Sequence, residues 1–234
     1  MKQLENSLIS MGLNLDQDMK EKFLAYMKGI LLWNEKINLT AITDEKEFIQ
    51  KHFIDSILCI PFDEYKNAKN IIDVGTGAGF PGIPLAIASD DKHFILADSL
   101  QKRLRVIDTL ADEIGISNIE TIHGRAEELG KNKAYRERFD LCVSRAVANL
   151  TVLAEYCLPF VKIGGFFLAY KGPDAEKEIE DAAKAIKILG GRIDRIACVA
   201  LSGYEHKIAV IQKVNRTPAK YPRKAGTPSK EPIR

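Results

Sequence analysis

The chain has 234 residues, of which 46% are hydrophobic and 28% are charged, and its formal net charge is +2. Folding of a chain of this size buries roughly 70% of the surface that the unfolded chain exposes, so a core can form without disulfides or a structural metal. The hydrophobic fraction excludes a disordered chain. No apolar run approaches the ~20 residues that a membrane helix needs. Glu5 and Asn6 interrupt the stretch that a signal peptide would need, so we expect none.

Residues 1–66 have the apolar spacing of helices. Apolar side chains recur at helical intervals after Asn14, and Asp16 lies where an acidic side chain favours a helix N-terminus. Thr43 is the predicted N-cap of a further helix, which Pro61 ends. We therefore expect a helical N-terminal extension that packs on the rest of the chain.

From Asn70 onward, short apolar runs alternate with amphipathic stretches. The predicted strands are 71–74, 94–97, 119–122, 139–143 and 166–170. The predicted helices lie near 82–88, 100–114, 147–158 and 174–189. Repeated βα units of this kind form a parallel sheet with helices on both faces. The predicted fold class is therefore α/β.

The last predicted strands differ from the others in their connection. Runs 193–201 and 207–214 are separated by Ser202-Gly203, which predicts an antiparallel hairpin at the edge of the sheet. Beyond residue 214 the apolar periodicity stops, and four of the nine prolines fall there. We expect residues 67–214 to form one domain and residues 215–234 to be an extended, basic tail.

The net charge is distributed unevenly. Residues 213–234 hold seven Lys and Arg and one Glu, a net charge of +6, which leaves −4 for residues 1–212. The four cysteines have no C-x-x-C spacing and stand in apolar surroundings, as is typical of reduced core residues. We therefore expect a cytoplasmic protein with a basic C-terminus; its cysteines are Cys59, Cys142, Cys157 and Cys198.

A glycine-rich segment, DVGTGAGFPG at residues 73–82, follows the first predicted strand and opens the next helix. Glycine at such a turn lets the backbone bend sharply and approach a ligand without a clash from Cβ. Pro81 suits the first turn of a helix, because its missing N–H needs no partner there. The segment therefore predicts a ligand-binding loop.

Two kinds of ligand fit this loop. Residues 77–82 match G-x-G-x-x-G, and Asp98 follows at the end of the next strand, as in a dinucleotide-binding dehydrogenase. However, Asp73 lies two residues before the first glycine, where a carboxylate would repel a pyrophosphate. It suits S-adenosyl-L-methionine, which has an ammonium, a sulfonium and a ribose but no phosphate. We favour the methyltransferase over the NAD-dependent oxidoreductase. The loop residues predicted to bind the donor are Asp73, Gly75, Gly77 and Gly79.

Two acidic residues near this loop have open alternatives. Asp98 fits either a contact with ribose hydroxyls or a helix N-cap. Residues 124–127 (GRAE) follow the third strand, where such folds contact the adenine, but Glu127 equally suits the first turn of a helix.

Several segments together resemble the RsmG (GidB) family of bacterial methyltransferases, which act on guanine N7 of small-subunit ribosomal RNA. The matching segments are Trp33-Asn34, 37–40 (INLT), His52 with Asp55-Ser56, 73–85 (DVGTGAGFPGIPL), Asp98-Ser99 with Lys102-Arg103, 144–148 (SRAVA) and 170–172 (YKG). The combination spans nearly the whole chain, whereas the glycine loop alone is typical of many methyltransferases.

The resemblance implies a Rossmann-like class I fold of S-adenosyl-L-methionine-dependent methyltransferases. Its sheet has seven mostly parallel strands with helices on both faces, and a helical extension precedes it. The implied target is guanine 527 of 16S rRNA. The residues that the resemblance implies for the methyl donor are Gly75, Phe80, Asp98, Ala126, Glu127 and Arg145.

The sequence at the end of the fourth strand bears on the methylated atom. Methylation of an exocyclic amine usually goes with an Asn/Asp-Pro-Pro-aromatic loop, but residues 143–147 read VSRAV. A C5-pyrimidine methyltransferase needs a cysteine nucleophile, and Cys142 lies inside an apolar run. Guanine N7 has a lone pair and no proton, so alignment suffices and no general base is expected. Arg145 is predicted to hold guanine O6 or the donor's carboxylate. A strand-end arginine paired to an acid is the alternative.

RNA affinity depends largely on phosphate contacts. Lys171, at the end of the fifth strand, is either such a contact or a solvated lysine. A basic tail either binds RNA or only aids solubility. The remaining RNA-binding candidates are Lys102, Arg103 and Arg105 after the second strand, and Arg216, Lys220, Arg223 and Lys224 in the tail.

The four histidines, His52 among them, have no metal-ligand spacing, so we expect structural or surface roles and no metal. The expected partners are 16S rRNA and the small ribosomal subunit, with no membrane partner, and we expect a monomer. A non-catalytic RNA-binding or ribosome-assembly module is the remaining alternative.

Overall fold

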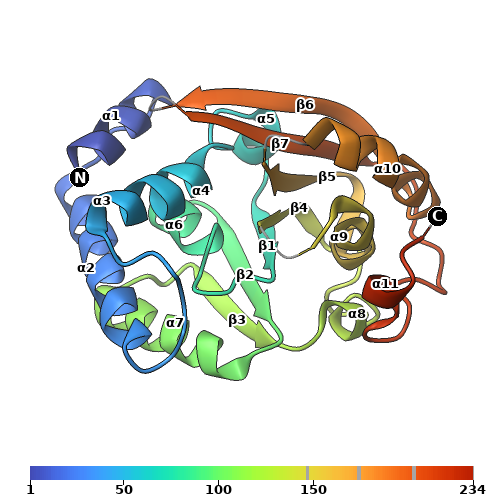
Figure 1. Ribbon diagram of the computed structural model, residues 1–234, viewed down its shortest axis with the longest axis horizontal. Coiled ribbons are helices and arrows are strands. Elements are labelled where there is room, and N and C mark those ends of the chain that lie inside the picture. Colours follow the sequence, from blue (N-terminus) through green and yellow to red (C-terminus); the bar gives the residue numbers. More distant parts are fainter. Residues whose placement is uncertain (146–147, 173–174, 202–203, 234) are drawn as a thin grey trace.

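A seven-stranded sheet with helices on both faces forms the body of the protein (Figure 1). The computed structural model describes residues 1–145, 148–172, 175–201 and 204–233. The strands are β1 (Asn70–Val74), β2 (His93–Asp98), β3 (Ile119–His123), β4 (Phe139–Arg145), β5 (Val161–Lys171), β6 (Gly191–Leu201) and β7 (Tyr204–Lys213). Their order in the sheet is β3-β2-β1-β4-β5-β7-β6, and β7 runs antiparallel to both of its neighbours.

This topology confirms the predicted α/β fold. The five strands expected to be parallel are parallel, and the two last strands pair as an antiparallel hairpin. β6 occupies the edge, whereas β7 inserts between β6 and β5. The turn predicted at Ser202-Gly203 lies outside the described residues. Because β1 and β4 are central neighbours, the segments after their carboxyl ends lie side by side where ligands bind in sheets of this kind.

Alternate residues of the strands pack against two separate cores. Ile71 belongs to the first, and its neighbour Ile72 belongs to the second, as the two-residue period of a strand requires. The first core is covered by α1 (Lys2–Ser10), α2 (Gln17–Asn34), α6 (Gly82–Ile87) and α7 (Gln101–Ile114). The second is covered by α8 (Ala126–Leu129), α9 (Leu150–Cys157), a 3₁₀ turn (Leu158–Phe160) and α10 (Ala175–Ile188). The N-terminal extension therefore shares a core with the sheet.

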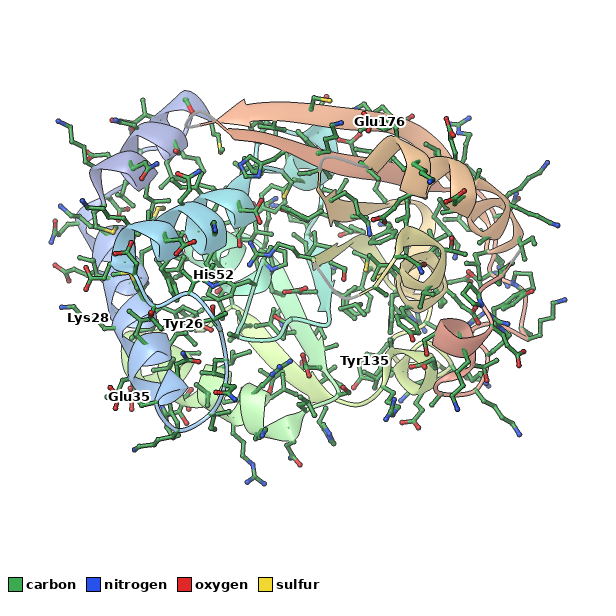
Figure 2. All side chains as sticks on the ribbon, viewed as in Figure 1. Tyr26, Lys28, Glu35, His52, Tyr135 and Glu176 are labelled. Carbon is green, nitrogen blue, oxygen red and sulfur yellow. The ribbon has the colours of Figure 1, made fainter. Side chains whose placement is uncertain are left out.

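Within the extension, α2 turns one face inward. Figure 2 shows Tyr26 on the inner side of this helix and Lys28 and Glu35 on its outer side. The helix begins at the acidic residues expected to favour its N-terminus, and Asp16 is its N-cap, because its Oδ1 accepts a hydrogen bond from the Met19 N–H at 2.8 Å.

The second half of the extension differs from the prediction at its start. It consists of α3 (Glu45–Phe48), a π-helical segment (Ile49–Ile54), α4 (Asp55–Ile57) and α5 (Asp63–Lys66). The expected N-cap at Thr43 is wrong, since Asp44 caps α3 and its Oδ1 accepts from the Glu47 N–H at 2.9 Å. The helical run still ends before Pro61.

The C-terminal tail is packed, so the expectation of an extended arm is wrong. It crosses beside α8 and α9 and ends in the short helix α11 (Thr227–Lys230) (Figure 1). The body of the protein donates hydrogen bonds to backbone carbonyls of the tail. The Arg136 guanidinium donates to the carbonyls of Thr217 and Tyr221 at 2.7 and 2.9 Å. Lys213, at the end of β7, is fully buried and donates to the Leu158 carbonyl at 2.6 Å.

Cys59, Cys142 and Cys157 are buried free thiols, as predicted, but Cys198 is exposed. The expectation of a core position for Cys198 is wrong because it lies on β6, the edge strand of the sheet. Among the described residues, no helix is long and apolar enough to cross a membrane.

Candidate active site

The glycine-rich loop joins β1 to α6 and is tied to the end of β2. The N–H groups of Gly75 and Thr76 donate to the Ala97 carbonyl at 2.8 and 3.1 Å. The Gly77 N–H donates to Asp98 Oδ2 at 2.9 Å. Gly77 has φ = 62°, a conformation that glycine adopts readily, and a Cβ on it would meet no atom within 4 Å. The loop therefore presents open backbone to the space above the sheet.

Asp73 supports this loop from below. Its carboxyl is fully buried, and Oδ2 accepts hydrogen bonds from Thr76 Oγ1 at 2.7 Å and from the Gly82 N–H at 2.9 Å. Burial raises the pKa of Asp73 to about 7 against the opposing effect of these hydrogen bonds. Asp73 lies outside the cavity lining. In this arrangement it fixes the loop through the two hydrogen bonds to Oδ2.

A cavity of about 510 Å³ opens above the loop. It extends over the carboxyl ends of β1, β2 and β4 and reaches the first turn of α8. Seven of the residues predicted for the methyl donor line it, namely Gly75, Gly77, Phe80, Asp98, Ala126, Glu127 and Arg145. Asp73 and Gly79 are the two predicted loop residues that do not. The structure thus gathers these seven residues from four separate segments of the chain.

Asp98 joins two loops at the floor of the cavity. Oδ2 accepts from the Gly77 N–H, and Oδ1 accepts from the Leu100 N–H at 2.8 Å. The Arg103 guanidinium lies 4.0 Å from Oδ2. A carboxylate has about four acceptor sites, so Asp98 keeps acceptor capacity for a ligand hydroxyl. It does not cap α7, whose N-cap is Leu100.

Glu127 forms the opposite wall, together with Tyr156 from α9. The Glu127 side chain is buried, and its Oε1 accepts a hydrogen bond from the Gly226 N–H of the tail at 2.8 Å. Glu127 lies in the first turn of α8, which was one of its two predicted positions, and it also lines the cavity.

Arg145 ends β4 and is held from several sides. Its Nη1 donates to Asp55 Oδ2 at 2.5 Å and to the Lys51 carbonyl at 2.8 Å. Its Nη2 lies 3.3 Å from His52 Nδ1, and its guanidinium carbon lies 5.5 Å from the centre of the Phe80 ring. Arg145 is therefore paired to an acid, Asp55, as one of the two sequence alternatives predicted. Its side chain also faces the first cavity.

His52 links Arg145 to the N-terminal extension, and Figure 2 shows it reaching toward the centre of the molecule. Its ring stacks on Phe80, with ring centres 4.4 Å apart and planes 2° from parallel. Its Nε2 lies 2.7 Å from Thr40 Oγ1. Burial, followed by the nearby charge of Arg145, lowers the pKa of His52 to about 4. Neutral His52 therefore accepts from Arg145 through Nδ1 and donates to Thr40 through Nε2.

Asp55 is the second support of Arg145. Burial raises the pKa of this carboxyl, but hydrogen bonds from His206 and Arg145 outweigh it and hold the pKa below its usual value. His206 Nδ1 lies 3.0 Å from Asp55 Oδ1. Asp55 is therefore ionised at neutral pH and fixes the guanidinium by charge as well as by hydrogen bonding.

A second cavity of about 670 Å³ lies on the other side of Arg145. Lys51, His52, Asp55, Tyr170, Lys171 and Glu178 are among its lining residues. Lys171 is only 7% exposed, and its ammonium pairs with Glu178 at 2.7 Å, so the solvated lysine expected as one alternative is wrong. Because Arg145 lines both cavities, it forms part of the wall between them.

The other predicted cations have different surroundings. Lys102 and Arg105 are exposed on the first turns of α7, and Arg103 lines the first cavity. In the tail, Arg216, Lys220 and Lys224 are exposed. Arg223 is bound to Glu155, with Nη2 2.7 Å from Oε2. Ala146 and Val147 lie outside the described residues.

Several residues of the site carried no functional prediction. Asp55 and Thr40 belong to segments noted only for their resemblance, and His52 was assigned a structural or surface role. Leu39, from the same resembling segment as Thr40, and Tyr156, which had no local sequence signal, also line the first cavity. The spacing of His52 and Asp55, three residues apart on one helical run, is the single pattern that indicates a shared face. Among the described residues, no group of three or more His, Cys, Asp or Glu could hold a metal ion.

Known proteins resemble this chain in both sequence and fold. A family model described as rRNA small subunit methyltransferase G (GidB) matches residues 19–207. The ribosomal RNA small subunit methyltransferase G of Clostridium beijerinckii is 50% identical over 233 residues, which are 99% of this chain and 98% of the relative. The protein of the same name from Clostridium tetani is 46% identical over 233 residues, again 99% and 98%.

Solved structures share the fold at low identity. Cofactor-bound Rv0187 from MTB is 15% identical and superimposes with a TM-score of 0.56, covering 86% of this chain and 91% of that one. The O-methyltransferase TomG from Streptomyces achromogenes, solved in complex with SAM, is 13% identical with a TM-score of 0.53 and the same coverage. The sheet is thus the Rossmann-like sheet of class I methyltransferases. The chain belongs to the rRNA small subunit methyltransferase G family and is a methyltransferase whose donor is S-adenosyl-L-methionine.

Proposed function

We propose that this protein transfers a methyl group to N7 of a guanine in 16S rRNA of the small ribosomal subunit, guanine 527 by family resemblance. The observation that carries the proposal is the position of Arg145 between two adjoining cavities. In this arrangement the first cavity takes the donor and the second takes the guanine. The names of the relatives, which refer to small-subunit ribosomal RNA, support the class of substrate.

The first cavity suits S-adenosyl-L-methionine in size and chemistry. Its volume of about 510 Å³ lies within the range of ~300–1,000 Å³ that is usual for ligand sites. Asp98 and Glu127 offer carboxylate acceptors to the ribose and adenine, and the open backbone at Gly77 admits a ligand close to the loop. When bound, the sulfonium supplies an activated methyl group, and the protein's residues bind and orient the reactants.

Arg145 retains two donors for a substrate. A guanidinium has five N–H donors. Nη1 gives two hydrogen bonds, to Asp55 and the Lys51 carbonyl, and Nη2 gives one to His52. Among the described residues, none accepts from Nε or from the second N–H of Nη2. These two donors can hold guanine O6, next to N7, or the donor's carboxylate.

The chemistry of the site favours an acceptor that is already nucleophilic. Cys142 is fully buried in β4, and burial together with neighbouring Cys157 raises the pKa of its thiol well above the usual value, so it is no nucleophile for C5 methylation. The lone pair of guanine N7 needs alignment with the methyl group and no proton removal. An arginine fixed by Asp55 and His52 supplies that alignment.

RNA affinity in this proposal comes from exposed cations around the cavities and on the tail. Lys102, Arg105, Lys220 and Lys224 are exposed, whereas Arg223 is committed to Glu155 and is left out of the RNA-contacting set. Each phosphate contact to a single strand changes the slope of log affinity against log salt by about 0.7. We expect Lys220→Ala with Lys224→Ala to reduce that slope by about 1.4, measured by filter binding. An unchanged slope would remove the tail from the RNA-binding surface.

The test of the proposed function is methylation of purified small subunits and of naked 16S rRNA, followed by strand cleavage at N7-methylguanine. Subunits from cells that lack the gene provide unmodified substrate. We expect one new cleavage in the loop around guanine 527. We also expect Arg145→Ala to abolish it while Lys28→Ala, an exposed change on the outer side of α2, leaves it unchanged. Methylation of another atom or another RNA would contradict the proposal.

A further inference from the structure

The tail is anchored to the body by a buried ion pair. Glu155 of α9 is 1% exposed, and its partner Arg223 donates to it through three N–H groups. The Arg223 backbone N–H lies 2.8 Å from Oε1, Nε lies 3.0 Å from Oε1, and Nη2 lies 2.7 Å from Oε2. A buried carboxylate needs such compensation, and within the described part of the chain Arg223 supplies all of it. The tail is therefore fixed at this point.

A second set of contacts joins the tail to the end of α8. The Arg136 Nη1 donates both to the carbonyl of Gly130, just after α8, and to the carbonyl of Tyr221, each at 2.9 Å. Pro222 packs beside Gly130, with its Cγ 3.1 Å from the point where a Cβ of Gly130 would lie. One arginine thus holds the tail and α8 together.

Just after these anchors in the chain, the tail contacts the lining of the first cavity. The Gly226 N–H donates to Glu127 Oε1 at 2.8 Å, and Glu127 is both buried and part of the cavity wall. Among the described residues, none donates a hydrogen bond to the other oxygen, Oε2. Burial, followed by the nearby charge of Glu127, raises the pKa of Tyr156, the neighbouring lining residue. Figure 1 shows α11 beside α8 and α9.

We propose that residues 217–231, here called the C-terminal strap, act as a positioning element for the methyl donor. The Arg223–Glu155 pair docks the strap, the docked strap fixes Oε1 of Glu127 through Gly226, and Oε2 is thereby directed to the ribose or adenine of the donor. The inference rests on the donor cavity of the proposed function. It gives Arg223, the arginine of the strap, a role in donor affinity instead of RNA affinity.

The test measures binding of S-adenosylhomocysteine, the product form of the donor, to the full chain by isothermal titration calorimetry without RNA. We expect Arg223→Met to raise the Kd about tenfold, the effect of about one lost hydrogen bond to a charged group. Arg223→Lys keeps the charge and should give an intermediate value. Arg216→Met removes an exposed tail charge that lies outside the strap and should leave the Kd unchanged. The KM for rRNA should not change in Arg223→Met.

A double-mutant cycle separates positioning from general destabilisation. If Arg223 acts through Glu127, Arg223→Met will have little further effect on the Kd in a Glu127→Gln background. A chain that ends at Pro222 and carries Glu155→Gln, which leaves no buried unpaired carboxylate, should show the same tenfold loss. That second variant decides the question if Arg223→Met does not fold.

Three results would overturn the proposal: wild-type donor affinity in the shortened chain, additive effects of Arg223→Met and Glu127→Gln, or a loss confined to the KM for rRNA. Donor binding is measured without RNA. A protein that binds the donor through the strap but methylates no 16S rRNA would therefore contradict the proposed function alone.

Discussion

Substitution by alanine at two glycines of the same loop should affect different properties. At Gly79 it should mainly lower stability, and at Gly77 it should mainly weaken donor binding. Gly77 and Gly79 have φ = 62° and 86°, and alanine in this conformation costs about 1–2 kcal/mol. A Cβ on Gly77 meets nothing within 4 Å, because the residue faces the first cavity. A Cβ on Gly79 would lie 2.3 Å from Tyr26 Oη and 2.6 Å from Ile83 Cγ1.

The cost at Gly79 is larger because neither neighbour can move away cheaply. Tyr26 is fully buried, and its hydroxyl donates to the Ala78 carbonyl at 2.8 Å. Overpacking of this kind adds about 1–3 kcal/mol. We therefore expect Gly79→Ala to lower the free energy of unfolding by about 2–5 kcal/mol and Gly77→Ala by about 1–2 kcal/mol. For a chain of this size each kcal/mol shifts the Tm by about 2–4 °C.

Ligand binding should reverse the order. The added methyl of Gly77→Ala enters the cavity, so we expect the Kd for S-adenosylhomocysteine to rise about tenfold, which is about 1.4 kcal/mol. Gly79→Ala, assayed below its Tm, should bind within about twofold of the wild type. Urea denaturation and calorimetry measure the two quantities separately. If Gly77→Ala proves as destabilising as Gly79→Ala, or binds the donor as the wild type does, the assignment of Gly77 to the cavity is refuted.

Three further predictions concern the supports of the site. Tyr26→Phe leaves the Ala78 carbonyl without its buried donor and should cost about 1–3 kcal/mol in urea denaturation; an unchanged midpoint would contradict this. Asp55→Asn frees Arg145 and should slow single-turnover methylation about 10²-fold while the donor Kd stays constant; a matching rise in Kd would assign Arg145 to the donor instead. The pKa of His52 is about 4 against an unfolded value of 6.5, so below pH 6.5 the unfolded chain binds a proton that the folded chain does not. Stability should fall from pH 6.5 to pH 4, and His52→Gln should reduce this fall in the free energy of unfolding; equal slopes would count against a buried neutral imidazole.

The centre of the site was predictable because its signals are local in sequence. The loop from Gly75 to Pro81 follows an apolar strand, and Asp98 ends the next one. In a parallel sheet the carboxyl ends of neighbouring strands must meet. The pairing of β1 with β2 does bring Gly77 within 2.9 Å of Asp98. Strand order and residue type were therefore enough to predict that the glycine loop and Asp98 lie together.

The supports of Arg145 were not predictable, because they join segments far apart in the chain. His52 lies 93 residues before Arg145, and its stacking on Phe80 depends on how the extension packs over the loop. No periodicity expresses such a contact. An imidazole with no metal-ligand spacing was assigned a structural or surface role, whereas its part in the site follows from burial and from the neighbouring arginine.

The number of tail cations available to RNA likewise depends on contacts between distant segments. A count of Lys and Arg residues treats every cation as available to bind phosphate. A cation that pairs with a carboxylate of the body stabilises the fold instead. Lys213, at the end of β7, lies 3.6 Å from Glu137, and Arg223 of the tail is bound to Glu155, so two of the seven cations counted in residues 213–234 compensate acids of the body. Both acids belong to the part of the chain whose net charge is −4.

The N-terminal extension and the C-terminal strap therefore both reach the first cavity, which is otherwise formed by the middle of the chain. Leu39 of the N-terminal extension and Glu127, fixed by Gly226 of the strap, border the same space as the loop at Gly77. Donor binding should then raise the stability of both terminal segments, because a ligand stabilises whatever must be ordered to hold it. Amide exchange should slow at both of these contacts when S-adenosylhomocysteine binds. An effect limited to the glycine loop would mean that the extension and the strap cover the core without shaping the site.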